Sequence, residues 1–148
     1  MKSATHIVIC ASLEFVYEAK KISSYLSLVG YNVVMPETMA MILNGYVSLE
    51  QIIKEKKSGE IASRIIKQES LKTHFRKISD GDSILVLNYT KNGIENYIGG
   101  QVLIEMAFAF ILDKPIYLLH NIPKLPYSDV IKAMMPKLLQ GDLNAIER

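Results

Sequence analysis

Cysteine is scarce in this sequence, with Cys10 as the single copy among 148 residues. One cysteine cannot form a disulfide within the chain, nor can it assemble a cage of several thiolates around a metal. This scarcity is typical of a reducing compartment, and we expect a cytoplasmic location. We expect Cys10 to be a small core residue rather than a nucleophile, because no sequence feature beside it indicates a lowered thiol pKa.

The sequence also lacks long apolar runs and a strong charge imbalance. No stretch of 18 apolar residues occurs, and the first residues do not form an apolar segment with a cleavage site. The net charge is +2, and Lys54, Lys56 and Lys57 alternate with Glu55 and Glu60, as on a solvated helix face. We therefore expect no membrane contact and no nucleic-acid polymer as partner.

Motifs for metals and cofactors are missing as well. The three histidines have no metal-ligand spacing. The glycine-containing loop with Gly93, Gly99 and Gly100 matches neither a Walker A loop nor a dinucleotide fingerprint. We expect neither a metal nor a cofactor.

The sequence does contain alternating strand and helix patterns, in a number that suits one domain. Apolar residues make up 49% and charged residues 22%, which is ordinary for a globular domain, and we expect a single domain over 1–148. Apolar runs predict strands at 6–10, 31–35, 83–87 and 115–119, and a short apolar segment lies at 138–139. Helical patterns cover 12–29, ended by Gly30, then 61–78, 102–112 and the region after 128, while 37–59 is expected to form a partly apolar loop with a polar helix at 48–57. The order predicts a three-layer α/β domain of the Rossmann or flavodoxin-like kind, with a mostly parallel sheet of about five strands.

The most informative single residue is Glu105, which interrupts the otherwise apolar helix at 102–112. A helix that is apolar all round is buried, and a buried carboxylate is costly unless it is paired or hydrogen-bonded. Functional sites concentrate such groups, although a structural carboxylate that caps a loop would also fit. We favour a functional role for Glu105.

Other polar or flexible positions are predicted to converge on the same edge. In open α/β folds, ligands bind beyond the carboxyl ends of the strands. The candidates that follow the first, second and third strands, or precede the Glu105 helix, are Cys10, Ala11, Ser12, Glu37, Asn88, Gly99 and Gly100. We predict that they line a substrate-binding site for a small molecule.

Several segments together resemble the nucleoside 2-deoxyribosyltransferase family and its relatives, the deoxynucleoside-monophosphate N-glycosidases. The similarity covers most of the chain, and its segments are 7–12, 31–37, 82–88, 99–109 and 113–116. It implies cleavage or transfer at the N-glycosidic bond of a nucleoside or nucleoside monophosphate, without a cofactor. Glu105 corresponds to the family's nucleophilic glutamate.

The chain departs from the family pattern in three places, one of which is a longer loop before Glu105. The first loop has Ala11-Ser12 where the family usually has Gly-Ser or Gly-Pro. An aspartate is normally found in the helix before the central strand, and His74 occupies that place here. We predict that His74 supplies the proton for the departing base, although a histidine on the apolar side of a helix is also compatible with a packed core residue.

Two other kinds of function stay open on the sequence: a non-catalytic nucleotide-binding module and a purely structural domain. The apolar helix at 102–112, together with Met134, Met135 and Leu138, favours a homodimer or a higher homo-oligomer. Because family relatives complete their pockets with a neighbouring subunit, the resemblance places the Tyr127-Ser128 region near a partner's site.

Overall fold

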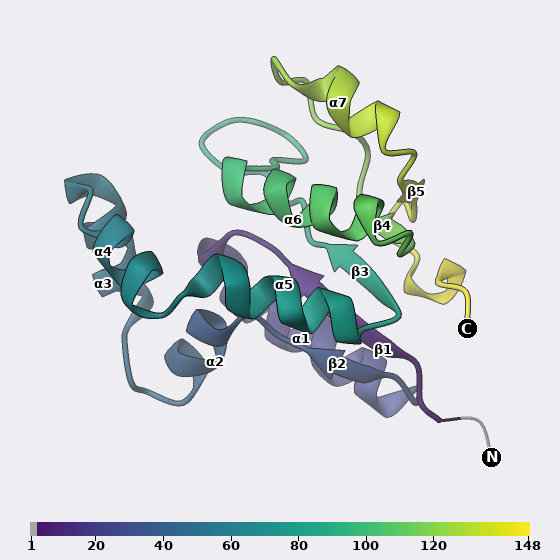
Figure 1. The fold of residues 1–148 in the computed structure, drawn as a ribbon, viewed down its shortest axis with the longest axis horizontal. Coiled ribbons are helices and arrows are strands. Elements are labelled where there is room, and N and C mark those ends of the chain that lie inside the picture. The colour runs from purple at the N-terminus through teal and green to yellow at the C-terminus, as the bar shows by residue number, and fades with distance from the viewer. Residues whose placement is uncertain (1–2) are drawn as a thin grey trace.

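The computed structural model, described here for residues 3–148, has one sheet of five parallel strands in the order β2-β1-β3-β4-β5 (Figure 1). The strands are β1 (His6–Cys10), β2 (Asn32–Val34), β3 (Ser83–Val86), β4 (Ile116–Leu118) and β5 (Lys137–Leu138). Helices connect them, as parallel pairing requires. The predicted three-layer α/β, Rossmann-like or flavodoxin-like class is confirmed.

Strand β1 lies between β2 and β3 and is buried on both faces. Its alternate side chains separate two apolar clusters: Ile7 and Ile9 belong to one, Val8 and Cys10 to the other. A strand covered on both sides needs apolar residues at every position, which explains the unbroken run in the sequence. Cys10 is the last residue of this strand, so its side chain faces the helices of the second cluster.

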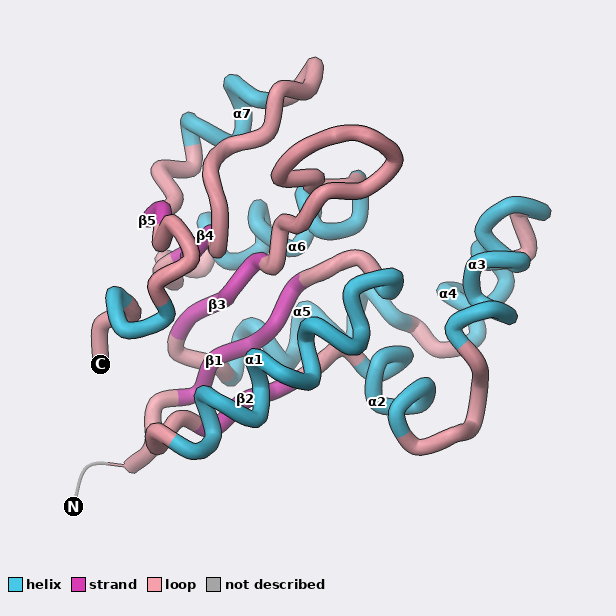
Figure 2. Tube along the Cα trace, turned by 180° about the vertical axis from the view of Figure 1, so that it is seen from behind, coloured by secondary structure: helices cyan, strands magenta, loops and turns pink. Residues whose placement is uncertain are grey.

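The helices form the two outer layers. One face of the sheet is covered by α1 (Val16–Leu28), which lies in front of β1 and β2 in Figure 2. The opposite face carries α5 (Ser70–Asp80) and α6 (Gly100–Ile111), which cross in front of the sheet in Figure 1. The short helix α7 (Ser128–Ala133) joins this second layer through Ile131, and the turn η2 (Leu143–Ala145) ends the chain on the first.

The first connection differs in detail from the prediction. The helical pattern was predicted from residue 12 onward, but a 3-10 turn, η1 (Leu13–Phe15), precedes α1. The Ser12 hydroxyl donates to the Glu14 carboxylate instead of accepting from the helix backbone. Gly30 follows the last turn of α1 with φ of 100°, the left-handed conformation predicted for it.

Within 37–59, the part expected to be a loop contains the helix α2 (Glu37–Leu43), which was not predicted. The polar helix expected at 48–57 is confirmed as α3 (Leu49–Ser58), and the Ser48 hydroxyl caps it by accepting from the Gln51 backbone N–H at 3.0 Å. The single helix predicted over 61–78 is also wrong, because it divides into α4 (Ile61–Lys67) and α5. Glu69 separates the two with φ of 47°, which interrupts the helical backbone.

Helix α6 buries one side and exposes another. Val102, Met106 and Ala109 are buried against the sheet, whereas Ile104 and Ile111 are 44% and 77% exposed. No helix within residues 3–148 is both long enough and apolar enough to cross a membrane.

Candidate functional site

A cavity of about 260 Å³ opens at the carboxyl end of the sheet, beside the ends of β1 and β2. It is enclosed by the segment after β1, the start of α2, α3 to α5, and the start of α6. Strand order reverses at β1, since β2 lies on one side and β3 on the other. This is the position at which open α/β sheets bind ligands, as predicted from the sequence.

Glu105 lies on the wall of this cavity and is only 4% exposed. It belongs to the second turn of α6, on the side of the helix that carries the buried Val102 and Met106. Burial raises the pKa of this carboxyl to about 8, because the charged form loses its hydration. At neutral pH the side chain is therefore mostly a carboxylic acid.

His74 faces Glu105 from the neighbouring helix α5. Its Nε2 is 3.3 Å from the Glu105 Oε2, and the ring is 5% exposed. Burial, together with the nearby positive charge of Lys77, lowers the pKa of His74 to about 4, although a hydrogen bond with the Ile9 backbone opposes this shift. The neutral imidazole and the protonated carboxyl thus form a pair that holds one proton between about pH 4 and about pH 8.

Cys10 is the third member of this buried group and contacts His74. Its Sγ is 3.4 Å from the His74 Nε2, and the residue is fully buried at the end of β1. Burial, followed by the negative charge of Glu105, raises the pKa of the thiol well above its ordinary value. Such a thiol is a poor nucleophile, in line with the expectation that Cys10 is a core residue.

A network of ions closes the cavity on the side of η1 and α3. Glu14 accepts hydrogen bonds from the Lys56 Nζ at 2.8 Å and the Lys91 Nζ at 3.0 Å. Although burial alone would raise it, the hydrogen bonds from Lys56 and Ser12 and the charge of Lys56 lower the pKa of Glu14 to about 2. The network joins three segments that are distant in sequence and holds two cationic groups on the wall of the cavity.

A second ion pair shapes the outer part of the same wall. The Arg64 guanidinium donates two hydrogen bonds to the Glu55 carboxylate, at 2.6 and 2.7 Å. This bidentate pair joins α3 to α4, which project together from the rest of the fold in Figure 2. Arg64 itself lines the cavity, so a polar ligand would meet its side chain.

Most of the predicted site residues meet here. The cavity is lined by Ala11, Ser12, Glu37, His74, Gly99, Gly100 and Glu105. Gly99 is closely surrounded, because a Cβ at this position would lie 3.3 Å from the ring of Tyr97, whereas a Cβ on Gly100 would meet nothing within 4 Å. Gly100 thus leaves open space at the start of α6.

Two predicted residues lie outside the cavity lining. Cys10 lies behind His74, and Asn88 is fully buried away from the cavity. The Asn88 amide donates to the carbonyl of Asn121 at 2.8 Å and accepts from the backbone N–H of His120 at 2.9 Å. Asn88 therefore ties the end of β3 to the loop after β4.

Sequence reasoning missed several polar residues of the cavity. Lys56 and Glu55 were assigned to a solvated helix face together with Lys54, Lys57 and Glu60. The last three are exposed, whereas Lys56 is half-buried and Glu55 is buried. Lys91 and Gln68 also line the cavity without having been predicted. A signal for Lys56 exists in the buried Ile52, one helical turn earlier, which places Lys56 near the inner side of α3.

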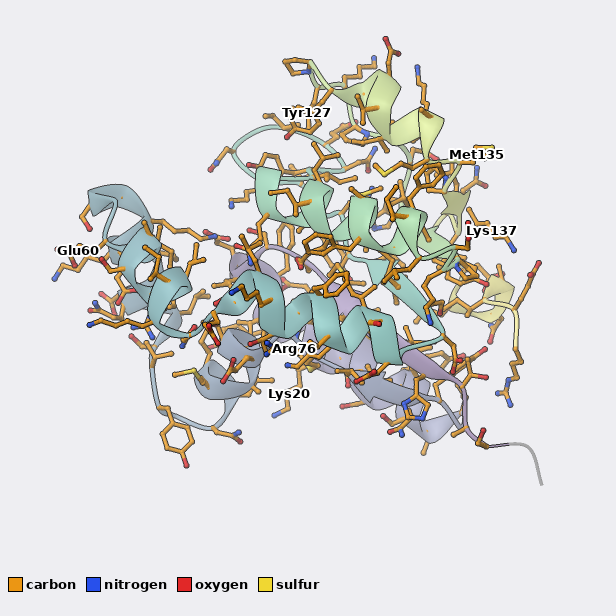
Figure 3. The ribbon with its side chains drawn as sticks, in the orientation of Figure 1. Lys20, Glu60, Arg76, Tyr127, Met135 and Lys137 are labelled. Carbon is orange, nitrogen blue, oxygen red and sulfur yellow. The ribbon has the colours of Figure 1, made fainter. Side chains whose placement is uncertain are left out.

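The expected contact of Tyr127 with a neighbouring subunit has a local alternative. The Tyr127 hydroxyl donates to the carbonyl of Ile98 in the loop before α6 of its own chain. Figure 3 shows Tyr127 beside that loop, at the start of α7. Ser128 is likewise held locally by the carbonyl of Pro123.

Comparisons with known proteins leave the fold and the cavity as the evidence for function. No family model matches the chain, and searches of curated proteins and of solved structures gave no significant match. The site is therefore defined only by its chemistry: a buried acid and a buried histidine lie on the wall of a cavity in a Rossmann-like fold.

Proposed function

We propose that this protein cleaves or transfers the N-glycosidic bond of a nucleoside or nucleoside monophosphate, with Glu105 as the nucleophile. The observation that carries this proposal is the buried Glu105 carboxyl on the cavity wall, 3.3 Å from the His74 imidazole. The cavity volume, about 260 Å³, is near the lower end for ligand pockets and suits a small molecule rather than a polymer.

The paired groups can supply both of the catalysts that the reaction needs. Transfer of the carboxyl proton from the Glu105 Oε2 to the His74 Nε2 generates a carboxylate and an imidazolium side by side. The carboxylate then attacks the anomeric carbon, the bond from that carbon to the base nitrogen breaks, and the imidazolium protonates the departing base. The product is a glycosyl ester on Glu105 and a neutral His74.

The second half of the reaction reverses these roles. The neutral His74 removes a proton from water, or from an acceptor base, as this attacks the anomeric carbon of the ester. The Glu105 carboxylate is released, and the proton on His74 returns the pair to its starting state. Each cycle consumes one nucleoside and one acceptor and needs no further reactant.

The walls of the cavity offer suitable groups for recognising such a substrate. Arg64, Lys56 and Lys91 provide charged donors toward a hydroxyl-rich or anionic ligand, and Gln68 adds a neutral amide. The Tyr97 side chain next to Gly99 provides an aromatic surface at the entrance to α6. A sugar or sugar phosphate between these groups and a base beside the aromatic ring would match their chemistry.

A non-catalytic nucleotide-binding module is the second candidate function. It is favoured by the raised pKa of Glu105, since a carboxylic acid at neutral pH can hydrogen-bond a ligand without attacking it. The two functions differ in their products. A binding module would be stabilised against unfolding by nucleotides without releasing a base.

The test is incubation of the purified protein with a panel of deoxynucleosides and their monophosphates, in the presence of a chelator. Free base is separated by chromatography and quantified. We expect release from at least one member of the panel, and its loss in Glu105→Ala. Glu60→Gln, which changes an exposed glutamate at the tip of the α3–α4 hairpin, is the matched control and should retain activity (Figure 3). Equal release by Glu105→Ala would contradict the proposal.

A further inference from the structure

We propose that Cys10, His74 and Glu105 also form a binding site for a zinc ion, whose occupation and the cleavage reaction exclude each other. The three side chains come from β1, α5 and α6, and each offers one ligand atom. All three ligand atoms lie within 4.8 Å of one another, and all three residues are buried. The reaction proposed above makes no use of the Cys10 thiol.

Two of the three separations between these atoms match those of a tetrahedral zinc site, and the third, between the Cys10 Sγ and the Glu105 carboxylate, is no more than 4.8 Å. Zinc bonds of about 2.3 Å to sulfur and about 2.0–2.2 Å to nitrogen and oxygen imply ligand separations of about 3.5 Å for sulfur and nitrogen. The same geometry implies about 3.4 Å for nitrogen and oxygen. The observed distances are 3.4 Å from the Cys10 Sγ to the His74 Nε2 and 3.3 Å from that nitrogen to the Glu105 Oε2.

The chemistry of the three ligands also favours zinc over the hard ions magnesium and calcium. A thiolate and an imidazole are preferred by borderline-soft ions, whereas magnesium and calcium take oxygen ligands. A thiolate and a carboxylate together balance the two charges of the ion, so that no net charge is buried.

The site has an entry path and an open coordination position. His74 and Glu105 line the cavity, while Cys10 lies behind them. An ion held by the three would therefore face the cavity with its fourth position, the arrangement of zinc sites that keep one exchangeable ligand. The ligands are far apart in sequence, since Cys10 and His74 are separated by 64 in residue number, which is why histidine spacing gave no sign of them.

The predicted consequence for activity follows from the double use of Glu105. A carboxylate oxygen that ligates zinc cannot attack an anomeric carbon, so zinc should inhibit and the substrate should weaken zinc binding by competition. This consequence rests on the proposed function, whereas the binding of the ion does not. Binding can thus be measured without any substrate.

The experiment uses the full chain after treatment with a chelator and a thiol reductant. Cobalt(II), which replaces zinc and gives an intense near-ultraviolet charge-transfer band with a thiolate, is titrated first, and zinc is then used to displace it. We expect one equivalent of cobalt, the thiolate band, and its loss on addition of zinc. Since loss of even an outer partner weakens metal binding about ten- to a hundredfold, Cys10→Ser should lose the band and weaken zinc binding by about a hundredfold or more.

His120→Gln is the matched control, since His120 is the histidine that packs on Tyr89, outside the cluster. It should bind as the wild type does. Circular dichroism melting shows whether Cys10→Ser is folded. If Cys10→Ser does not fold, His74→Asn serves as a second variant, and it must also weaken zinc binding. Absence of the thiolate band in the wild type, or zinc binding that both variants leave unchanged, would overturn the site. Zinc that binds as expected without slowing base release would overturn the mutual exclusion alone, and absence of base release without zinc would count against the proposed function only.

Discussion

Replacing Glu105 by glutamine should make the protein more stable at neutral pH. Glutamine has the shape of the protonated carboxyl and can donate to the His74 Nε2 in its place. The wild-type carboxyl has a pKa of about 8 in the folded state, against an ordinary 4.5. The folded protein therefore binds more protons than the unfolded chain between these values, so this group lowers stability as the pH rises from 4.5 to 8.

The magnitude follows from the two pKa values. A tenfold change in proton affinity is worth about 1.4 kcal/mol, so the free energy of unfolding of Glu105→Gln should exceed that of the wild type by on the order of 3 kcal/mol at pH 7. At pH 4.5 the difference should shrink to less than about 1 kcal/mol. The contribution of His74 is present in both proteins and cancels in this comparison.

Urea denaturation at pH 4.5, 6, 7 and 8 in the presence of a chelator measures this difference. Glu60→Gln removes a carboxylate that is exposed to solvent and serves as the control, for which we expect no pH-dependent gain (Figure 3). If Glu105→Gln is less stable than the wild type at pH 8, or if the two curves run parallel, Glu105 is a structural carboxylate and the account of its burial is wrong.

Three further predictions concern the reaction, the ion network and the assembly. The rate of base release should fall as the pH rises through about 8, because the buried acid and histidine then lose the proton that they share. A pH–rate profile from about pH 5 to about pH 9.5 would show this fall. A fall near pH 6.5 would instead indicate a histidine of ordinary pKa. Glu14→Gln should lower the free energy of unfolding by about 1 kcal/mol at pH 7, because Lys56 and Lys91 lose their shared carboxylate. The lowered pKa of Glu14 means that this difference is present above about pH 4.5 and disappears as the pH falls toward 2, and a difference unchanged at pH 3 would speak against an ionic cause. Light scattering should show at least a dimer. Ile111→Lys, on the exposed side of α6, should dissociate this dimer, whereas Leu28→Lys, on the exposed side of α1, should not. A wild-type monomer would show that α6 needs no partner.

The fold could be predicted from the sequence because its central elements are locally unambiguous. Strands β1 and β3 are buried on both faces, so they appear as unbroken apolar runs, and Gly30 takes the left-handed conformation that its place after a helix indicates. The break between α4 and α5 was missed because the apolar period continues across it. Only the backbone conformation of Glu69 reveals the interruption.

The candidate site was predictable in part, for a different reason. Glu105 could be found from the sequence because an acidic residue stands out within an otherwise apolar helical segment. The meeting of Cys10 with His74 could not, since tertiary packing alone brings β1 and α5 together across 64 positions. Lys56 was predicted to be solvent-exposed like its neighbours because composition does not show which side of a polar helix faces a cavity.

The most direct test of the central claim is a search for the glycosyl ester on Glu105. The protein is mixed with a substrate that releases its base, quenched rapidly in acid and measured by intact mass, and the modified peptide is then located by fragmentation. We predict an added mass equal to the sugar or sugar phosphate, on the peptide that contains Glu105, and its absence in Glu105→Gln. Rapid base release with no adduct on Glu105, or with an adduct on another residue, would contradict the account.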